Sequence, residues 1–202
     1  MPYQFTNDWF LAHRPAWERI LAKFNPAKIL EIGSFEGQST CFLIEFLSRN
    51  RAHKRCSIVC IDSWQGGREH ADENFISVEE RFDRNTSFAL AASSDVELVK
   101  LKNMSQIALI NLLAKSNGSP RFDFVYIDGS HDACDVLSDA VLAMALLNPG
   151  GLMCFDDFLW HAGDQNPLHT PRLAIESFVN CYRDKIFLFD SGQARQLWLR
   201  KL

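Results

Sequence analysis

Apolar positions along this chain follow two alternating patterns. Residues 8–24 carry apolar side chains at helical spacing until Asn25-Pro26 stops them, which predicts an amphipathic helix. Short aliphatic runs, typical of strands buried on both faces, occupy residues 28–33, 57–62, 96–101, 122–128 and 152–157. Helix and strand signals therefore alternate along most of the sequence.

Helical spacing returns between these runs. We predict helices over residues 38–48, in the second half of 64–95, and over 106–115, 133–144 and 172–183. The letters NPGG at 148–151 predict a turn that ends a helix before the fifth strand begins. Residues 185–190 and 195–201 read as two strands around the turn 191–194, so the chain is expected to close with an antiparallel hairpin.

This order of elements predicts an α/β fold. Strands that alternate with helices form a parallel sheet with helices on both faces, because the crossovers are right-handed. Five such strands and the hairpin give a Rossmann-like, doubly wound, seven-stranded sheet that is mostly parallel. The 202 residues, 47% hydrophobic, suit one domain over 1–202, with 1–26 as a helical extension and 64–95 as an insert that covers the site.

Charge and composition narrow the class of partner. The formal net charge is −4 and no block of Lys or Arg occurs, so we expect a small-molecule partner and neither nucleic acid nor a membrane. The N-terminal residues lack the basic start and apolar run of a signal peptide, which favours a cytoplasmic protein. A homo-oligomer stays open. The cysteines form no CxxC pair, so buried free thiols are favoured over disulfides or a zinc site.

Carboxylates follow all but the third of the five predicted parallel strands. Glu31, Asp62, Asp128 and Asp156 each lie where an aliphatic run ends. The carboxyl ends of parallel strands share one edge of the sheet, and ligands of such folds bind there. We therefore expect these acids to converge on a polar site.

The turn after the first strand reads Glu31-x-Gly33-x-x-x-Gly37. It lacks the G-x-G-x-x-G spacing of a dinucleotide site, and its acids suit a cationic ligand better than a phosphate. The turn resembles the first motif of class I S-adenosylmethionine-dependent methyltransferases, in which the acid after the second strand binds the ribose hydroxyls. The resemblance implies that S-adenosylmethionine binds Glu31, Gly33, Ser34, Gly37, Ser39, Asp62, Ser63, Trp64, Ser105 and Asp128. It further leads us to expect that Gly33→Val blocks the cofactor and leaves the fold largely intact.

The stretch from residue 122 to 160 resembles the metal-dependent O-methyltransferases of the catechol, caffeoyl-CoA and macrolide-sugar type. That resemblance implies that Asp128, Asp156 and Asp157 bind a divalent cation such as Mg²⁺, for which oxygen ligands are suitable. Neighbouring strand residues point to opposite faces, so Asp156 and Asp157 can reach one ion only where the backbone turns. In the alternative, Asp157 caps the next segment and Asp156 faces solvent.

His131 stands three residues after Asp128, where the catechol enzymes hold a lysine base and some sugar enzymes a histidine. The resemblance implies that His131 and Asp128 are catalytic, with the imidazole taking a proton from the acceptor hydroxyl. Alternatively, His131 caps a helix or contacts the cofactor. The acceptor would be framed by Trp160, His161, Arg68 and His70.

Two other functions remain open at this point. A nucleotide-cofactor oxidoreductase is disfavoured by the missing glycine and by the final hairpin. A non-catalytic module could keep the fold and bind a partner through its aromatic N-terminal helix. The acceptor itself is not identified by any motif.

Overall fold

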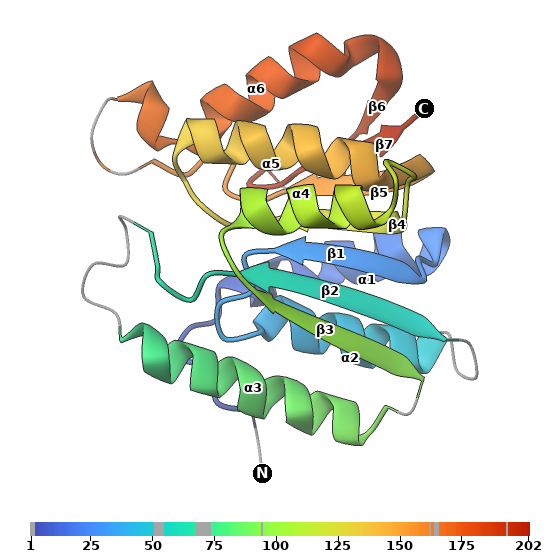
Figure 1. Ribbon diagram of the computed structural model, residues 1–202, viewed down its shortest axis with the longest axis vertical. Helices are drawn as coiled ribbons and strands as arrows, with labels where there is room; N and C mark the ends of the chain where they lie inside the picture. Colours follow the sequence, from blue (N-terminus) through green and yellow to red (C-terminus); the bar gives the residue numbers. More distant parts are fainter. Residues whose placement is uncertain are drawn as a thin grey trace.

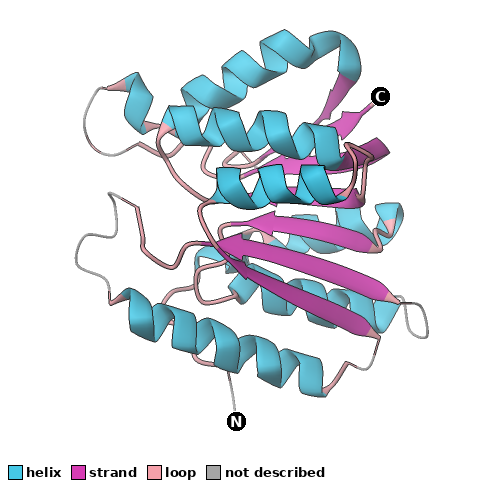
Figure 2. Ribbon diagram, viewed as in Figure 1, coloured by secondary structure: helices cyan, strands magenta, loops and turns pink. Residues whose placement is uncertain are grey.

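The computed structural model of this protein describes residues 3–50, 55–67, 74–93, 95–161, 163, 166–192 and 194–202. It contains a seven-stranded sheet of order β3-β2-β1-β4-β5-β7-β6 (Figures 1 and 2). The strands are β1 (Lys28–Ile32), β2 (Cys56–Asp62), β3 (Val96–Lys102), β4 (Phe122–Ile127), β5 (Leu147–Phe155), β6 (Ile186–Phe189) and β7 (Leu197–Lys201). β1 to β5 pair in parallel, whereas β7 is antiparallel to both β5 and β6. The predicted sheet and closing hairpin are confirmed.

Helices cover both faces of the sheet. Figure 1 shows α4 (Ser105–Lys115), α5 (Ala133–Leu146) and α6 (Pro171–Tyr182) on one face, and α1 (Arg14–Phe24), α2 (Gln38–Asn50) and α3 (Phe75–Ala91) on the other. Successive strand residues alternate between the two resulting cores, as β4 shows: Phe124 and Tyr126 face one core, Val125 and Ile127 the other. Each fully buried apolar side chain of this kind contributes about 1.5–3 kcal/mol to folding.

The N-terminal segment is attached to the sheet by aromatic packing. Trp17 of α1 is fully buried, and its ring centroid lies 5.3 Å from Phe124, 4.7 Å from Tyr126 and 5.7 Å from Trp198 in edge-on contacts. Its indole Nε1 donates to Gln196 Oε1 at 2.9 Å, 179 positions along the chain. α1 is therefore fixed over β4 and β7 near the carboxyl edge of the sheet.

The single helix predicted over residues 8–24 is wrong. A short 3-10 helix, η1 (Trp9–Ala12), comes first, and α1 begins only at Arg14. Pro15 explains the break, because proline has no N–H to donate to the carbonyl four residues earlier and its ring crowds that carbonyl. In the first turn of α1 the missing donor costs nothing.

The turn predicted at residues 148–151 is also different. β5 starts at Leu147, so these residues lie inside the strand, where the register shifts between the pairs of Phe122 and Phe124. A β-bulge absorbs extra residues within a strand in this way, and Gly150 has a φ of 78° there. The helix predicted in the second half of the insert is present as α3.

Cysteine burial follows the prediction only in part. All six cysteines are free thiols, and Cys41, Cys56, Cys60 and Cys154 are buried, but Cys134 and Cys181 are exposed. Among the described helices, none combines the length and the apolar character needed to span a bilayer.

Candidate functional site

The ends of the central strands come together as their register dictates. Ile32 pairs with both Ile61 and Ile127, and Ile127 pairs with Phe155. The residues that follow these positions are therefore neighbours at one edge of the sheet, as expected from the sequence. Two groups of polar residues lie there, one at the turn after β1 and one after β4 and β5.

Glu31 forms the interior of the first group. Its carboxylate is fully buried and accepts hydrogen bonds from the side chains of Ser34 (2.8 Å), Ser39 (2.6 Å), Thr40 and Cys60 (3.3 Å). Burial raises the pKa of Glu31, and the hydrogen bonds from the three hydroxyls oppose that rise. The carboxylate thus ties the start of α2 to β1, and direct contact of Glu31, Ser34 or Ser39 with a cofactor stays a prediction.

Asp62 connects the turn to the end of β2. Its Oδ2 accepts the backbone N–H groups of Ser34 and Phe35, each at 2.9 Å, and its Oδ1 accepts the N–H of Trp64 at 2.7 Å. A carboxylate has about four lone-pair positions, so one remains for a ligand. Asp62 is partly exposed, and its binding of the ribose stays a prediction.

Gly33 is required by the fold itself. Its φ is 84°, and a Cβ at this position would lie 1.8 Å from the Asp128 carbonyl oxygen. The expectation that Gly33→Val leaves the fold intact is therefore wrong, because the side chain would meet backbone. Gly37 has a φ of 80° and sits against the Phe82 ring of α3, where a Cβ would be 3.0 Å away.

Trp64 is a core residue. It is 4% exposed, its Nε1 donates to the Phe35 carbonyl at 2.9 Å, and its ring centroid is 4.9 Å from that of Phe82. Lys100 Nζ lies 4.5 Å from the same centroid, in cation–π contact. Contact of Trp64 with adenine stays a prediction. Only the small part of the ring that the surrounding side chains leave exposed could make this contact.

Two predicted serines have partners in the protein. The Ser63 hydroxyl accepts the N–H of Gln65 at 3.2 Å. Ser105 begins α4 and hydrogen-bonds to Asp139 of α5. Burial raises the pKa of Asp139 to about 7, although the hydrogen bond from Ser105 lowers it. Ser63 directly follows Asp62, and Ser105 lies two residues after Asn103, whose N–H donates to the Asp62 carbonyl at 3.0 Å. Both serines are therefore at strand ends beside Asp62, as predicted.

Asp128 and Asp156, here called the acid pair, form the second group. The Tyr126 hydroxyl joins them: it donates to Asp128 Oδ2 at 2.8 Å or to Asp156 Oδ2, and it lies within hydrogen-bond distance of both. Gln196 Nε2 donates to Asp156 Oδ2 at 3.1 Å, and the N–H of Asp157 donates to Asp156 Oδ1 at 2.8 Å. The alternative in which Asp156 faces solvent is wrong, because its side chain is only 10% exposed.

The surroundings of the acid pair disfavour two ionised carboxylates. Burial raises the pKa of Asp128 and of Asp156, and repulsion between neighbouring carboxylates raises both further. The pKa of Tyr126 is also raised, first by burial and then by these two acids. Because burial and like charge both oppose ionisation of the two carboxylates, the pair favours an added proton or a nearby cation.

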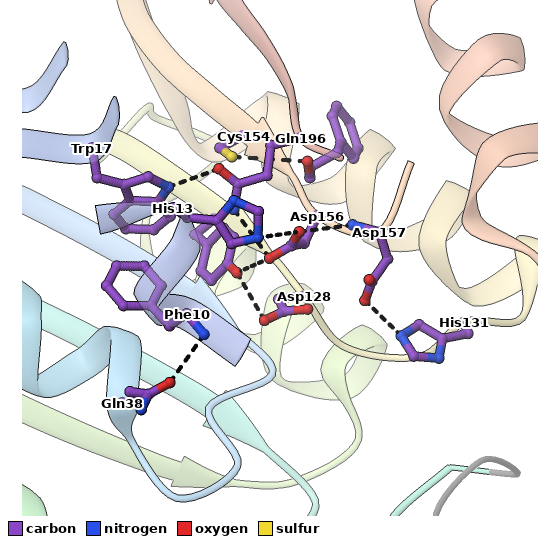
Figure 3. A network of polar contacts seen from close by, with 12 residues as sticks. Phe10, His13, Trp17, Gln38, Asp128, His131, Cys154, Asp156, Asp157 and Gln196 are labelled. Carbon is purple, nitrogen blue, oxygen red and sulfur yellow. Dashed lines mark hydrogen bonds and ion pairs between the residues drawn. The ribbon is translucent and has the colours of Figure 1, made fainter. Parts of the chain in front are cut away.

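Asp157 points away from the acid pair. Its φ is 56°, so the backbone does turn after β5, but its Oδ2 lies 2.8 Å from His131 Nε2 (Figure 3). The centroid of the His131 ring lies 4.0 Å from that of the Trp160 ring, with the two planes tilted by 32°. The predicted metal ligands therefore separate into the acid pair and a His131–Asp157 pair. No group of three His, Cys, Asp or Glu side chains arranged for a metal occurs in the part of the chain that the structure describes.

Several site residues are not predicted from the sequence. Tyr126 could have been found, because it precedes Asp128 by two positions and strand side chains repeat with period two. His13 and Gln196 carry no motif, and only the packing of α1 and β7 brings them to Asp156. Of the residues predicted to frame the acceptor, Trp160 lies beside His131 and His161 is exposed, whereas Arg68 and His70 fall outside the described residues.

Comparisons with known proteins agree with this geometry. Residues 30–158 match a family model described as a methyltransferase domain. No curated protein matches the chain in a sequence search.

Solved structures share the fold. An O-methyltransferase from Bacillus cereus in complex with SAH has a TM-score of 0.68 at 16% identity, covering 98% of this chain and 84% of that one. The O-methyltransferase TomG from Streptomyces achromogenes, in complex with SAM, has a TM-score of 0.64 at 16% identity, covering 95% and 79%. A putative caffeoyl-CoA O-methyltransferase from Staphylococcus aureus has a TM-score of 0.64 at 13% identity, covering 99% and 86%.

Proposed function

Because residues 30–158 place this chain in the methyltransferase domain family, we propose that it transfers a methyl group from S-adenosylmethionine to a hydroxyl of a small molecule. The transfer is assisted by a divalent cation at the acid pair and by His131 as general base. One observation carries the proposal: the acid pair and the His131–Asp157 pair follow β4 and β5 at the same edge of the sheet.

The cofactor assignment rests on the turn after β1 and on Asp62. The residues of this turn present backbone at a strand end, and Asp62 has a lone pair free for a hydroxyl donor. Two of the similar solved structures contain SAM or its product SAH. The net charge of −4 fits a cationic cofactor better than a nucleic acid substrate.

The donor set of the acid pair suits a hard divalent cation. Asp128 and Asp156 supply carboxylate oxygens in an interior short of positive charge, and a cation between them would relieve the repulsion that raises the pKa of both. When bound, such an ion would lower the pKa of the acceptor hydroxyl, while S-adenosylmethionine supplies the electrophilic methyl carbon.

His131 supplies the base. Asp157 Oδ2 lies 2.8 Å from His131 Nε2, which orients the ring and places a carboxylate beside it. As the acceptor oxygen forms its bond to the methyl carbon and the carbon–sulfur bond breaks, the hydroxyl proton would pass to the His131 imidazole. Asp157 then stabilises the imidazolium, as a carboxylate does beside a catalytic histidine.

The test begins with calorimetry of S-adenosylmethionine and NAD(P)H, followed by a screen of small hydroxyl compounds with methyl-labelled cofactor. We expect S-adenosylmethionine to bind and one compound class to be labelled. His131→Gln should then lower kcat by about 10²- to 10⁴-fold with little change in cofactor affinity. His169→Gln is the matched control and should retain full activity.

Other outcomes would overturn the proposal. Binding of NAD(P)H alone would indicate an oxidoreductase, and cofactor binding without transfer to any compound would indicate a non-catalytic module.

A further inference from the structure

The outer side of α4 and α5 exposes large hydrophobic side chains to solvent. The two helices lie side by side on one side of the sheet (Figure 1), and Gln106 Nε2 of α4 donates to Asp135 Oδ1 of α5 at 3.2 Å. Offsets of three residues along α4 and four along α5 put the exposed residues on one side of each helix. These residues, here called the apolar face, and their exposed fractions are Met104 48%, Ile107 51%, Ile110 55%, Leu137 36% and Val141 40%.

Both helices are apolar on their inner and outer sides. Their inner sides, which include Leu109 and Ala140, are already buried in the core against the sheet. The only charged residue of α4 is Lys115, at its last position, and α5 contains only Asp135 and Asp139, of which Asp139 is 1% exposed. A helix that is hydrophobic all round is normally buried on all sides. The composition of α4 and α5 therefore indicates that another surface covers the apolar face.

α3, on the opposite side of the sheet, shows what an ordinary surface helix of this protein looks like. Its sequence contains a run of charged residues between Glu79 and Arg84. Glu79 and Asp83 form ion pairs with lysines of β3, and an exposed apolar residue such as Ile76 stands near these charges. Single exposed apolar residues are normal on a surface, whereas the apolar face joins five across two neighbouring helices.

We propose that a second copy of this chain covers the apolar face in a two-fold symmetric dimer. In such a contact a surface meets its own copy, so each charge on it would approach a like charge. Residues 104–114 contain no charged residue, and the one charge in residues 136–145 is the buried Asp139, so self-association brings no like charges together. An anionic membrane fits this face less well, because the chain has a net charge of −4 and α4 and α5 together offer only Lys115 as a cation.

The size of the apolar face suits a reversible dimer. Helices of 11 and 14 residues are about 16 and 21 Å long, and neighbouring axes lie about 10 Å apart, so the two outer sides span roughly 400 Å² in projection. Because side chains protrude, the accessible area is larger than this projection and approaches the lower end of specific interfaces, about 600 Å² per partner. We therefore expect a dissociation constant of about 1–100 µM.

The experiment is sedimentation velocity of the full chain over a concentration range of about 1–200 µM. The weight-average mass of wild type should rise with concentration from the 23.1 kDa of one chain toward twice that value. Raising the salt concentration should not weaken the dimer, because the apolar face has no charges to screen.

Ile110→Lys should weaken association at least about tenfold, because each copy then buries a charge without a partner. Ile76→Lys, the matched control, makes the same change on α3, where the side chain is 74% exposed, and should dimerise as wild type does. Leu137→Lys repeats the test from α5 if circular dichroism shows that Ile110→Lys does not fold.

A wild-type chain that stays monomeric over the whole concentration range overturns the inference. A dimer that Ile110→Lys and Leu137→Lys leave intact also overturns it, because the copies then meet through another surface. If wild type is monomeric and cosediments with phosphatidylcholine vesicles, while Ile110→Lys does not, the apolar face binds a membrane instead. None of these results bears on methyl transfer, which calorimetry with S-adenosylmethionine tests separately.

Discussion

The two polar regions at the carboxyl edge of the sheet treat their carboxylates in opposite ways. In the turn after β1, comprising residues 31–40 and Asp62, Glu31 accepts four side-chain hydrogen bonds and Asp62 accepts three backbone N–H groups. In the acid pair, Asp128 and Asp156 share one phenol, burial raises the pKa of both, and neighbouring carboxylates raise it further, Asp156 and Asp157 for Asp128 and Asp157 for Asp156. In the first region the chain supplies hydrogen-bond donors to each acid, whereas in the second, buried carboxylates lie close enough to repel one another.

This difference separates acids that hold the fold in place from acids that can take part in the reaction. A carboxylate whose oxygens are satisfied by the protein holds a turn in place and preorganises it for a ligand. A buried pair of acids without counter-charge is stable only if protons or a cation join it. Burial alone does not distinguish the two, since Glu31 is more buried than Asp156. The charge around each acid does, because burial and then neighbouring carboxylates raise the pKa of Asp128 and Asp156, whereas burial alone raises the pKa of Glu31.

The largest expected effect comes from Gly33, where the two regions touch. In Gly33→Ala the new Cβ would lie 1.8 Å from the Asp128 carbonyl oxygen, so the free energy of unfolding should fall by more than about 4 kcal/mol. Gly118→Ala is the control: its φ is 72° and no atom lies within 4 Å, so only strain of about 1–2 kcal/mol is expected. Urea unfolding of both variants measures the difference, and equal losses would mean that no clash exists.

Asp156→Asn tests whether the acid pair takes part in the reaction. It keeps the shape of the side chain but removes a charge, so methyl transfer should fall by about 10³-fold or more while S-adenosylmethionine affinity stays within about threefold. Treatment of wild-type protein with a chelator should have the same effect. Asp184→Asn changes an exposed acid of side-chain exposure 96% and should be neutral. Turnover within tenfold of wild type would mean that Asp156 has a structural role, as Glu31 has.

Asp139 lies close to Gly129, between the two regions. Its titration should make the free energy of unfolding depend on pH. Burial raises its pKa to about 7, so between about pH 4 and pH 7 the folded protein holds a proton that the unfolded chain has released. That stabilisation is complete below about pH 4 and is lost as the pH rises through 7. From pH 4 to 8, the free energy of unfolding of wild type should fall by about 3–4 kcal/mol more than that of Asp139→Asn.

Denaturant titrations at several pH values measure this difference. Asp184→Asn should follow wild type, because that acid is exposed. Parallel curves for wild type and Asp139→Asn would mean that folding does not raise the pKa of Asp139.

Asp62→Ala tests whether the completed turn also binds a ligand. Loss of charged hydrogen bonds to the ribose should weaken S-adenosylmethionine binding by about 1.5–3 kcal/mol, measured by calorimetry. The variant should also unfold more easily, because three backbone N–H groups lose their acceptor. In Asp62→Asn the amide oxygen can still accept some of these bonds, so stability should recover more than affinity. Full affinity in both variants would remove Asp62 from the ribose site.

The smallest effect is expected for Trp64→Phe. This change removes only the indole N–H bond to the Phe35 carbonyl and part of the ring, so it should cost about 1 kcal/mol of stability. Cofactor affinity should change less than about twofold if the ring serves the core. A tenfold loss in calorimetry would instead confirm the predicted contact with adenine.

Local patterns in the sequence determine much of this protein. Aliphatic runs, helical spacing and the closing hairpin predict the seven-stranded sheet, since each depends on the period of a single segment. The same periods place Glu31, Asp62, Asp128 and Asp156 at one edge, because parallel strands end there together. Local sequence patterns misplace the start of a helix at Pro15 and the start of a strand at the bulge of residues 148–151.

Only the tertiary structure decides which acids act together. Asp156 faces α1 and Asp157 faces His131, so two adjacent acids predicted to share one ion lie in different environments. His13 and Gln196 reach the acid pair from opposite ends of the chain, through the packing of Trp17 against the sheet. No sequence period links such distant segments, because their contact depends on how whole helices and strands pack once their apolar faces are buried.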